Sequence, residues 1–147
     1  MTISQPTEVS ALLDRYLVSL DYDKLDDEWA RGLFTEDARV VFPMSEHAGI
    51  DGLAEYHRNA LAAWKRTHSL GSTAVVEIDG DLATLRANLT TTHVHLAENA
   101  PPGGERDPLF VAGTAVSGQA RRTPDGWRLS LLSVELVWAT GSPPPMP

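Results

Sequence analysis

The second half of the chain alternates long β-rich runs with short turn signals, and this pattern constrains the fold more than any other feature. The runs cover residues 69–78, 82–96, 109–122 and 127–138. Asp79-Gly80-Asp81 and Pro124-Asp125-Gly126 each separate two of these runs, and such glycine-containing turns are typical of β-hairpins. We therefore predict a long antiparallel meander.

The first half has helical patterning instead. Pro6 starts a segment whose apolar residues recur at helical spacing up to Leu20. A second, shorter helix is expected to end near Leu33, and a third to run from an N-cap at Asp51 to about Trp64. Helices followed by a meander predict an α+β fold in which helices cover one face of a sheet.

We expect one domain over residues 1–140, because neither a repeat nor a linker divides the chain before its end. Residues 141–147 are rich in proline, and we expect a disordered tail there. Residues 98–108 hold three prolines and two glycines, so a mobile loop is expected at the rim of the sheet.

Composition excludes several classes of protein. The 147 residues carry a net charge of −8, whereas a nucleic-acid-binding protein needs a basic surface, so we expect no nucleic-acid partner. No apolar run is long enough to cross a membrane, and the first residues lack a signal-peptide pattern, so we expect a cytoplasmic protein. The absence of cysteine excludes disulfides and thiolate chemistry.

The first hairpin brings histidines together. If Gly80-Asp81 form a two-residue turn, Ile78 faces Ala83 and Val76 faces Leu85, which gives one continuous apolar face. The same register places His68 directly opposite His93, about 5 Å apart between Cβ atoms, and alternation puts His95 on that face as well. A bulge within these ten residues would break the register.

Three interpretations of these histidines remain open. Each can be a satisfied structural residue, but two imidazoles on an apolar face both need hydrogen-bond partners, which favours acid–base chemistry. A zinc site is the other option, since three histidines and a carboxylate can supply ligands. No short metal-binding motif such as HExxH occurs, so no metal is predicted.

A carboxylate is needed to orient such a histidine, and the end of the first helix offers two. Asp21 and Asp23 both lie on or near the apolar stripe of that helix, and of the two we prefer Asp21. Tyr16 and Tyr22 are hydroxyl donors beside them. The candidate residues for the lining of a hydrophobic pocket are Phe42, Trp64, His95, Phe110 and Trp138.

At these residues the chain resembles the SnoaL-like proteins of the nuclear-transport-factor-2-like superfamily, over about residues 8–140. Its relatives include scytalone dehydratase, ketosteroid isomerase, limonene epoxide hydrolase and polyketide cyclases. The resemblance implies a cone-shaped, curved mixed or antiparallel sheet wrapped around about three N-terminal helices, with an interior pocket. The segments that carry it are Tyr16-Leu17-Val18-Ser19-Leu20-Asp21, Leu33-Phe34-Thr35-Glu36-Asp37-Ala38, Thr67-His68-Ser69-Leu70-Gly71, Thr92-His93-Val94-His95 and Asp125-Gly126-Trp127-Arg128.

The resemblance also implies roles. His93, oriented by Asp21, looks like a general base, and His68 looks like the group that protonates a leaving oxygen or polarises a carbonyl, with help from Tyr16 or Tyr22. The expected protein is a cofactor-independent lyase, cyclase or isomerase that acts on a small hydrophobic, polyketide-like carbonyl compound, and a homodimer is the default. The alternatives are a non-catalytic ligand-binding or accessory domain and an epoxide hydrolase, for which Glu135 is the one further strand-borne acid.

Overall fold

The computed structural model describes residues 4–99 and 108–144, which form three helices and a seven-stranded sheet. The helices are α1 (Gln5–Tyr22), α2 (Asp27–Leu33) and α3 (Leu53–Leu61), with a short 3-10 turn at Ala97–Asn99. The strands are β1 (Phe34–Val41), β2 (Glu46–Ala48), β3 (Trp64–Gly71), β4 (Val75–Asp79), β5 (Leu82–His95), β6 (Leu109–Thr123) and β7 (Gly126–Gly141).

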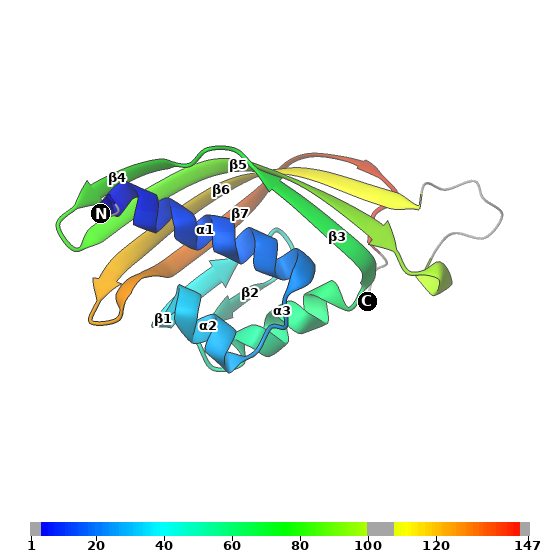
Figure 1. Cartoon of the computed structure of the whole chain (residues 1–147). Helices are drawn as coiled ribbons and strands as arrows, with labels where there is room; N and C mark the ends of the chain where they lie inside the picture. The colour runs from blue at the N-terminus through cyan, green and yellow to red at the C-terminus, as the bar shows by residue number, and fades with distance from the viewer. Residues whose placement is uncertain (1–3, 100–107, 145–147) are drawn as a thin grey trace.

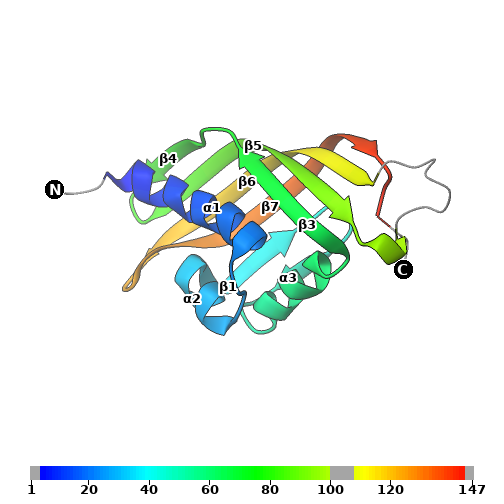
Figure 2. The same ribbon diagram turned by 45° about the vertical axis from the view of Figure 1, so that its right-hand side comes forward.

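The sheet is mixed and open. Its order is β2-β1-β7-β6-β5-β3, with β4 also paired to β5. All of these pairs are antiparallel except β1 with β7. Figures 1 and 2 show the sheet curving over α1, α2 and α3, which all lie on its concave side. The predicted α+β fold, a curved sheet wrapped around N-terminal helices, is confirmed.

Helix α1 forms where its apolar stripe is predicted. Ser4 caps its N-terminus by accepting a hydrogen bond from the Thr7 amide, and Pro6 lies in the first turn. The helix buries Leu12, Tyr16 and other apolar side chains against the sheet. Its last turn lies over β3, because the carboxylate of Asp21 accepts the backbone N–H of Ser69 at 2.9 Å.

The predicted hairpin register is confirmed for β4 and β5, where Ile78 pairs with Ala83 and Val76 with Leu85. It does not continue into β3. There Thr67, not His68, pairs with His93, and Gly71 pairs with Leu89. The expectation that His68 and His93 face each other is therefore wrong.

A bulge between β3 and β4 causes this shift. Three residues, 72–74, lie between Gly71 and Val75, whereas only two lie between their partners on β5. Ser72 holds the bulge, because its N–H donates to Asn88 O at 2.8 Å and its hydroxyl accepts the Asn88 N–H at 2.8 Å. The extra residue moves the side chains of residues 66–71 to the face opposite to that predicted, and a second irregularity between Trp64 and Arg66 places Trp64 opposite His95.

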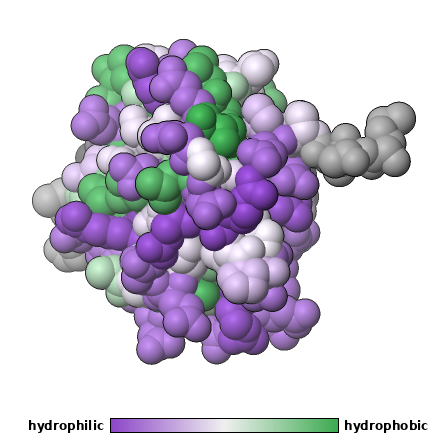
Figure 3. All heavy atoms as spheres, turned by 90° about the vertical axis from the view of Figure 1, so that its left-hand side faces the viewer, coloured by the Kyte–Doolittle hydropathy of each residue, from purple (hydrophilic) through white to green (hydrophobic). Residues whose placement is uncertain are grey.

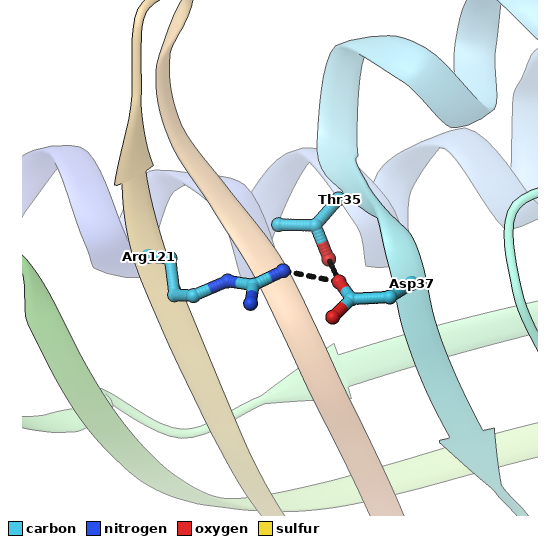
Figure 4. Close-up of polar contacts among 3 residues, drawn as sticks. All are labelled: Thr35, Asp37 and Arg121. Atoms are coloured by element: carbon cyan, nitrogen blue, oxygen red, sulfur yellow. Dashed lines mark hydrogen bonds and ion pairs between the residues drawn. The ribbon is translucent and has the colours of Figure 1, made fainter.

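A polar contact joins β1 to β6 across β7 (Figure 4). The Asp37 carboxylate accepts hydrogen bonds from the Thr35 hydroxyl and the Arg121 guanidinium, and these hydrogen bonds lower the pKa of Asp37. The contact is solvent-exposed, so it adds little to stability. Figure 3 shows the end of the molecule that carries the β4–β5 and β6–β7 turns, and hydrophilic side chains cover most of it.

The last strand runs further than expected. Gly141 still belongs to β7, so the expectation that residue 141 lies outside the sheet is wrong. Ser142 is buried, and its N–H donates to Leu109 O at 3.0 Å. Residues 100–107, in which most of the expected mobile loop falls, and residues 145–147 of the expected disordered tail lie outside the described residues.

The packing around Gly118 gives a first testable prediction. Gly118 is buried, and a Cβ atom there would lie 2.9 Å from the Leu131 carbonyl oxygen and 3.2 Å from Leu85 Cγ. Gly118→Ala is therefore expected to lower the free energy of unfolding by about 1–3 kcal/mol, measured by urea denaturation.

The matched control is Gly32→Ala, because Gly32 is helical and exposed and a Cβ atom there meets nothing within 4 Å. Alanine favours helix over glycine, so this variant is expected to be as stable as the wild type or slightly more stable. Equal stability of the two variants would contradict the predicted packing.

Candidate functional site

His93 is the side chain around which a site forms. It lies on β5 between Thr67 of β3 and Phe110 of β6. Its Nδ1 is 3.0 Å from the Phe110 carbonyl oxygen. A carbonyl only accepts, so Nδ1 carries the proton in the neutral ring and Nε2 keeps its lone pair. Within residues 4–99 and 108–144, no hydrogen bond is made to Nε2.

The surroundings keep this ring neutral. Burial lowers the pKa of His93 below its ordinary value of 6.5, and the neighbouring His95 lowers it further. The hydrogen bond to Phe110 O and the charge of Asp21 act in the opposite direction, but the net pKa remains lowered. At neutral pH His93 is therefore an unprotonated imidazole with a lone pair on Nε2.

Asp21 reaches the sheet beside His93 without touching the imidazole. Its Oδ1 accepts the Thr67 hydroxyl at 2.9 Å, and its Oδ2 accepts the Ser69 N–H at 2.9 Å. Thr67 in turn pairs with His93. The expectation that an aspartate bonds directly to one of the paired histidines is thus wrong, because within the described residues Asp21 bonds Thr67 and Ser69 and forms no hydrogen bond to His93. Asp23 is exposed at the C-cap of α1.

Aromatic rings surround His93 on its other sides. The Trp64 ring lies 4.6 Å from His93 and 4.8 Å from His95 between centroids. Phe110 stacks nearly parallel to Trp64, with centroids 6.0 Å apart and an angle of 7°. Trp64, His93 and Phe110 are each half-buried. Three of the predicted lining residues, Trp64, His95 and Phe110, thus lie around the predicted base.

The other predicted site residues do not join this group. His68 is exposed and shares a face with Thr92, opposite to that of His93. Tyr22 is 67% exposed. The indole of Trp138 covers Gly113, because a Cβ atom there would overlap it. Gly113 pairs with Thr90, so Trp138 lies on the face of the sheet that carries His68 and not on that of His93. Phe42 packs against Tyr56 instead.

Tyr16 belongs to a second polar pair, which the sequence analysis missed. Its hydroxyl is 2.7 Å from Nε2 of His57, and both side chains are buried. Nδ1 of His57 donates to Leu53 O at 2.8 Å, so Nε2 is the acceptor and Tyr16 the donor. The signal for His57 was available, since it lies one helical turn after the buried Leu53 on α3.

This pair is closed to substrate. The rings of Trp29, Phe34 and Phe42 lie 5.0 Å, 6.4 Å and 6.1 Å from the His57 ring between centroids, and both nitrogens of that ring are bonded within the protein. Burial raises the pKa of Tyr16 and lowers that of His57, so both groups are neutral. Tyr16 and His57 thus stabilise the core between the helices and the sheet.

Two hollows in the surface of the described residues lie elsewhere and are open to solvent. One, of about 460 Å³, lies between α1 and α2 and is lined by Val18, Trp29 and neighbouring residues. The other, of about 590 Å³, is lined by charged residues near Asp51. Neither reaches His93, and the enclosed pocket expected from the sequence is not one of them. Phe34, Tyr16 and their neighbours fill the space beneath α1.

In the described part of the chain, no group of three or more histidine, cysteine, aspartate or glutamate side chains is arranged to hold a metal ion. Among residues 4–99 and 108–144 there is also no helix of sufficient length and hydropathy to cross a bilayer.

A comparison with known families covers most of the chain. The profile of the SnoaL-like domain matches residues 1–133. The chain belongs to the SnoaL-like family. Solved structures agree with this SnoaL-like fold, whereas no curated protein sequence matches the chain.

Three solved structures illustrate the similarity. The Kfla4162 protein of Kribbella flavida is 26% identical, with a TM-score of 0.81 over 91% of each chain. A putative scytalone dehydratase of Novosphingobium aromaticivorans is 15% identical, with a TM-score of 0.75 over 92% of this chain and 86% of that one. A hexachlorocyclohexane dehydrochlorinase of Novosphingobium barchaimii is 14% identical, with a TM-score of 0.75 over 92% and 88%. The last two likenesses concern the fold alone.

Removal of the Tyr16 hydroxyl tests the buried pair. Tyr16→Phe keeps the ring but leaves Nε2 of His57 buried without a donor, so the free energy of unfolding is expected to fall by about 1–3 kcal/mol in urea denaturation. Tyr22→Phe, at an exposed position, is the control and is expected to change nothing. Equal stability of the Tyr16 variant and the wild type would contradict the hydrogen bond.

The lowered pKa values predict how stability depends on pH. Below 6.5, the ordinary pKa, histidines of the unfolded chain bind protons that His57 and His93 do not bind in the folded state. Acidification therefore favours the unfolded state, and the free energy of unfolding is expected to fall as pH drops below 6.5. Urea denaturation at several pH values measures this slope.

His93→Gln is expected to reduce the slope, because it removes one of the two histidines whose pKa is lowered. Gly32→Ala, which changes no titratable group, is the control and is expected to leave the slope unchanged. An equal slope in wild type and His93→Gln would show that His93 titrates normally.

Proposed function

We propose that this protein is a cofactor-independent lyase or isomerase in which Nε2 of His93 removes a proton from a carbon atom next to a carbonyl of a small hydrophobic substrate. The supporting observation is the hydrogen bond from Nδ1 to Phe110 O, which leaves the lone pair on Nε2, a nitrogen with no hydrogen-bond partner among the described residues. Burial keeps that base unprotonated at neutral pH. A general base must have both a free lone pair and a pKa at or below the working pH.

One base is sufficient for the proposed reaction. The C–H bond breaks, the proton moves to Nε2, and the electron pair passes into the carbonyl as an enolate. In a dehydration the enolate expels a β-hydroxyl, forming a C=C bond, and the imidazolium returns its proton to the departing oxygen as water forms. In an isomerisation the imidazolium returns the proton to another carbon atom of the enolate. Both routes regenerate neutral His93.

Asp21 supports this cycle through charge. Its negative charge raises the pKa of His93 and therefore stabilises the imidazolium that forms when the proton is removed. Thr67 and Ser69 hold the carboxylate in place, so it is an electrostatic and positioning group and does not take the proton. His68 is exposed on the opposite face of the sheet, so it has no role in this proposal.

The comparisons agree with this reaction class. Two similar structures are described as a putative dehydratase and a dehydrochlorinase, and both names denote eliminations. A polyketide-like substrate, a homodimer and a cytoplasmic location remain predictions. An epoxide hydrolase fits less well, because Glu135 is exposed and pairs with Ala115, on the face opposite to that of Val134. A non-catalytic ligand-binding domain is the outcome if no proton transfer occurs.

The proposed base can be tested without knowledge of the natural substrate. 5-Nitrobenzisoxazole opens when a base removes its one ring C–H next to nitrogen, which breaks the N–O bond and yields a coloured cyanophenolate. We expect the wild type to catalyse this reaction and His93→Gln to lose on the order of 100-fold or more in rate, since a positioned base contributes about 10²–10⁴. Asp21→Asn is expected to lose less.

His68→Gln is the matched control and is expected to retain full activity. The rate should rise with pH to a plateau, and the midpoint of this rise should lie below pH 6.5, because the pKa of His93 is lowered. Equal rates for His93→Gln and wild type, or losses that only follow the melting temperature, would make His93 structural and the protein a binding domain.

A further inference from the structure

The chain turns sharply after β7 and crosses the end of the sheet. Gly141 has a φ of +92°, and a side chain there would overlap the Leu109 carbonyl. The turn brings Ser142 over Leu109, to whose carbonyl it donates at 3.0 Å. Figure 2 shows this last segment running from β7 toward the start of β3. Residues 141–144 form a segment that we name the C-terminal strap.

His95 holds the other side of the strap. It is 5% exposed, and its Nε2 is 2.8 Å from Ser142 O, so Nε2 carries the proton. Its Nδ1 is fully buried and has no hydrogen-bond partner within the described residues. The one side-chain hydrogen bond of this imidazole is therefore the bond to the strap. A buried histidine with half of its hydrogen-bonding capacity unused calls for a reason other than stability.

The strap lies close to the proposed base. Gly141 pairs with Phe110, whose carbonyl holds Nδ1 of His93. Trp64 packs against both histidines, with centroids 4.6 Å from His93 and 4.8 Å from His95. Trp64 therefore links the surroundings of His95 to those of His93 by direct ring contacts.

We infer that His95 is a positioning residue that latches the C-terminal strap across the end of the sheet beside His93, so that the strap limits the size of the ligand that reaches this histidine. This inference rests on the proposed function only in taking the surroundings of His93 as the ligand site. His95 itself takes no part in proton transfer, because Nδ1, the nitrogen that keeps the lone pair when Nε2 donates to Ser142 O, is fully buried.

Three variants separate the latch from packing. His95→Phe keeps an aromatic ring beside Trp64 but removes the donor. His95→Gln keeps an N–H donor near the place of Nε2 and is expected to rescue the latch. Gly141→Ala acts on the strap from its other end, without a change at His95, by forcing the chain away from Leu109. His68→Phe, at an exposed position on the same sheet, is the matched control.

The first measurement is hydrogen exchange of the Ser142 amide, followed by nuclear magnetic resonance. Loss of the latch exposes this N–H, so exchange is expected to be on the order of tenfold faster in His95→Phe and Gly141→Ala, a change that corresponds to about one hydrogen bond. Exchange at the wild-type rate is expected in His95→Gln and His68→Phe. An unchanged rate in His95→Phe overturns the latch.

The second measurement is ligand binding without catalysis. 5-Nitrobenzotriazole has the shape of the benzisoxazole probe but cannot open, and its binding is followed by quenching of tryptophan fluorescence, together with that of a bulkier phenyl-substituted analogue. In His95→Phe and Gly141→Ala, we expect the affinity for the bulkier compound, relative to that for the small one, to be several-fold higher than in the wild type. An unchanged ratio despite faster exchange at Ser142 overturns the limit on ligand size.

These outcomes are independent of the proposed reaction. If the wild type binds the benzotriazole but does not open the benzisoxazole, the proposed function fails while the latch is still decided by exchange and by the binding ratio. If the wild type opens the benzisoxazole and His95→Phe leaves exchange and binding unchanged, the latch fails and the proposed function is retained. If the wild type binds neither benzotriazole, the limit on ligand size is overturned as well.

Discussion

The bulge at residues 72–74 decides which side chains can meet. Two hydrogen bonds between Ser72 and Asn88 hold it, and it moves β3 by one residue against β5. As a result Thr67 lies opposite His93 and carries the Asp21 carboxylate to within electrostatic reach of that histidine. Without the bulge His68 would take this place, and the hydroxyl that binds Asp21 would point to the other face.

His57, His93 and His95 share one type of hydrogen bond, and they differ in the surroundings of the second ring nitrogen. Each places one ring nitrogen against a backbone carbonyl, which fixes the tautomer. In His57 the second nitrogen accepts the Tyr16 hydroxyl, so the ring is saturated and serves the core. In His93 the second nitrogen is not bonded within the described residues. The same amino acid therefore serves stability in one place and offers a reactive lone pair in the other.

The sequence was a good guide to the fold and to part of the site. Helical spacing before Leu20 predicted α1, and the turn at Gly80 predicted the β4–β5 hairpin, because these depend on local periodicity. The third helix was predicted at the right place but with wrong ends, since its N-cap is Gly52 and not Asp51, and it ends at Leu61, before Trp64 begins β3. The pairing of β3 could not be predicted, since a bulge depends on one serine that replaces a regular ladder contact. His57 was not predicted, because one histidine on a short helix does not by itself indicate a buried polar pair, although its spacing from Leu53 places it on the buried face of α3.

The tautomer of His93 is the central claim, since base chemistry requires a free Nε2. Nitrogen-15 chemical shifts of the imidazole rings, followed through a pH titration, report for each ring which nitrogen carries the proton and at what pH the second proton binds. The expected result for His93 is a proton on Nδ1 at neutral pH and a pKa below 6.5. A proton on Nε2 at neutral pH, or a pKa above 6.5, would contradict the account.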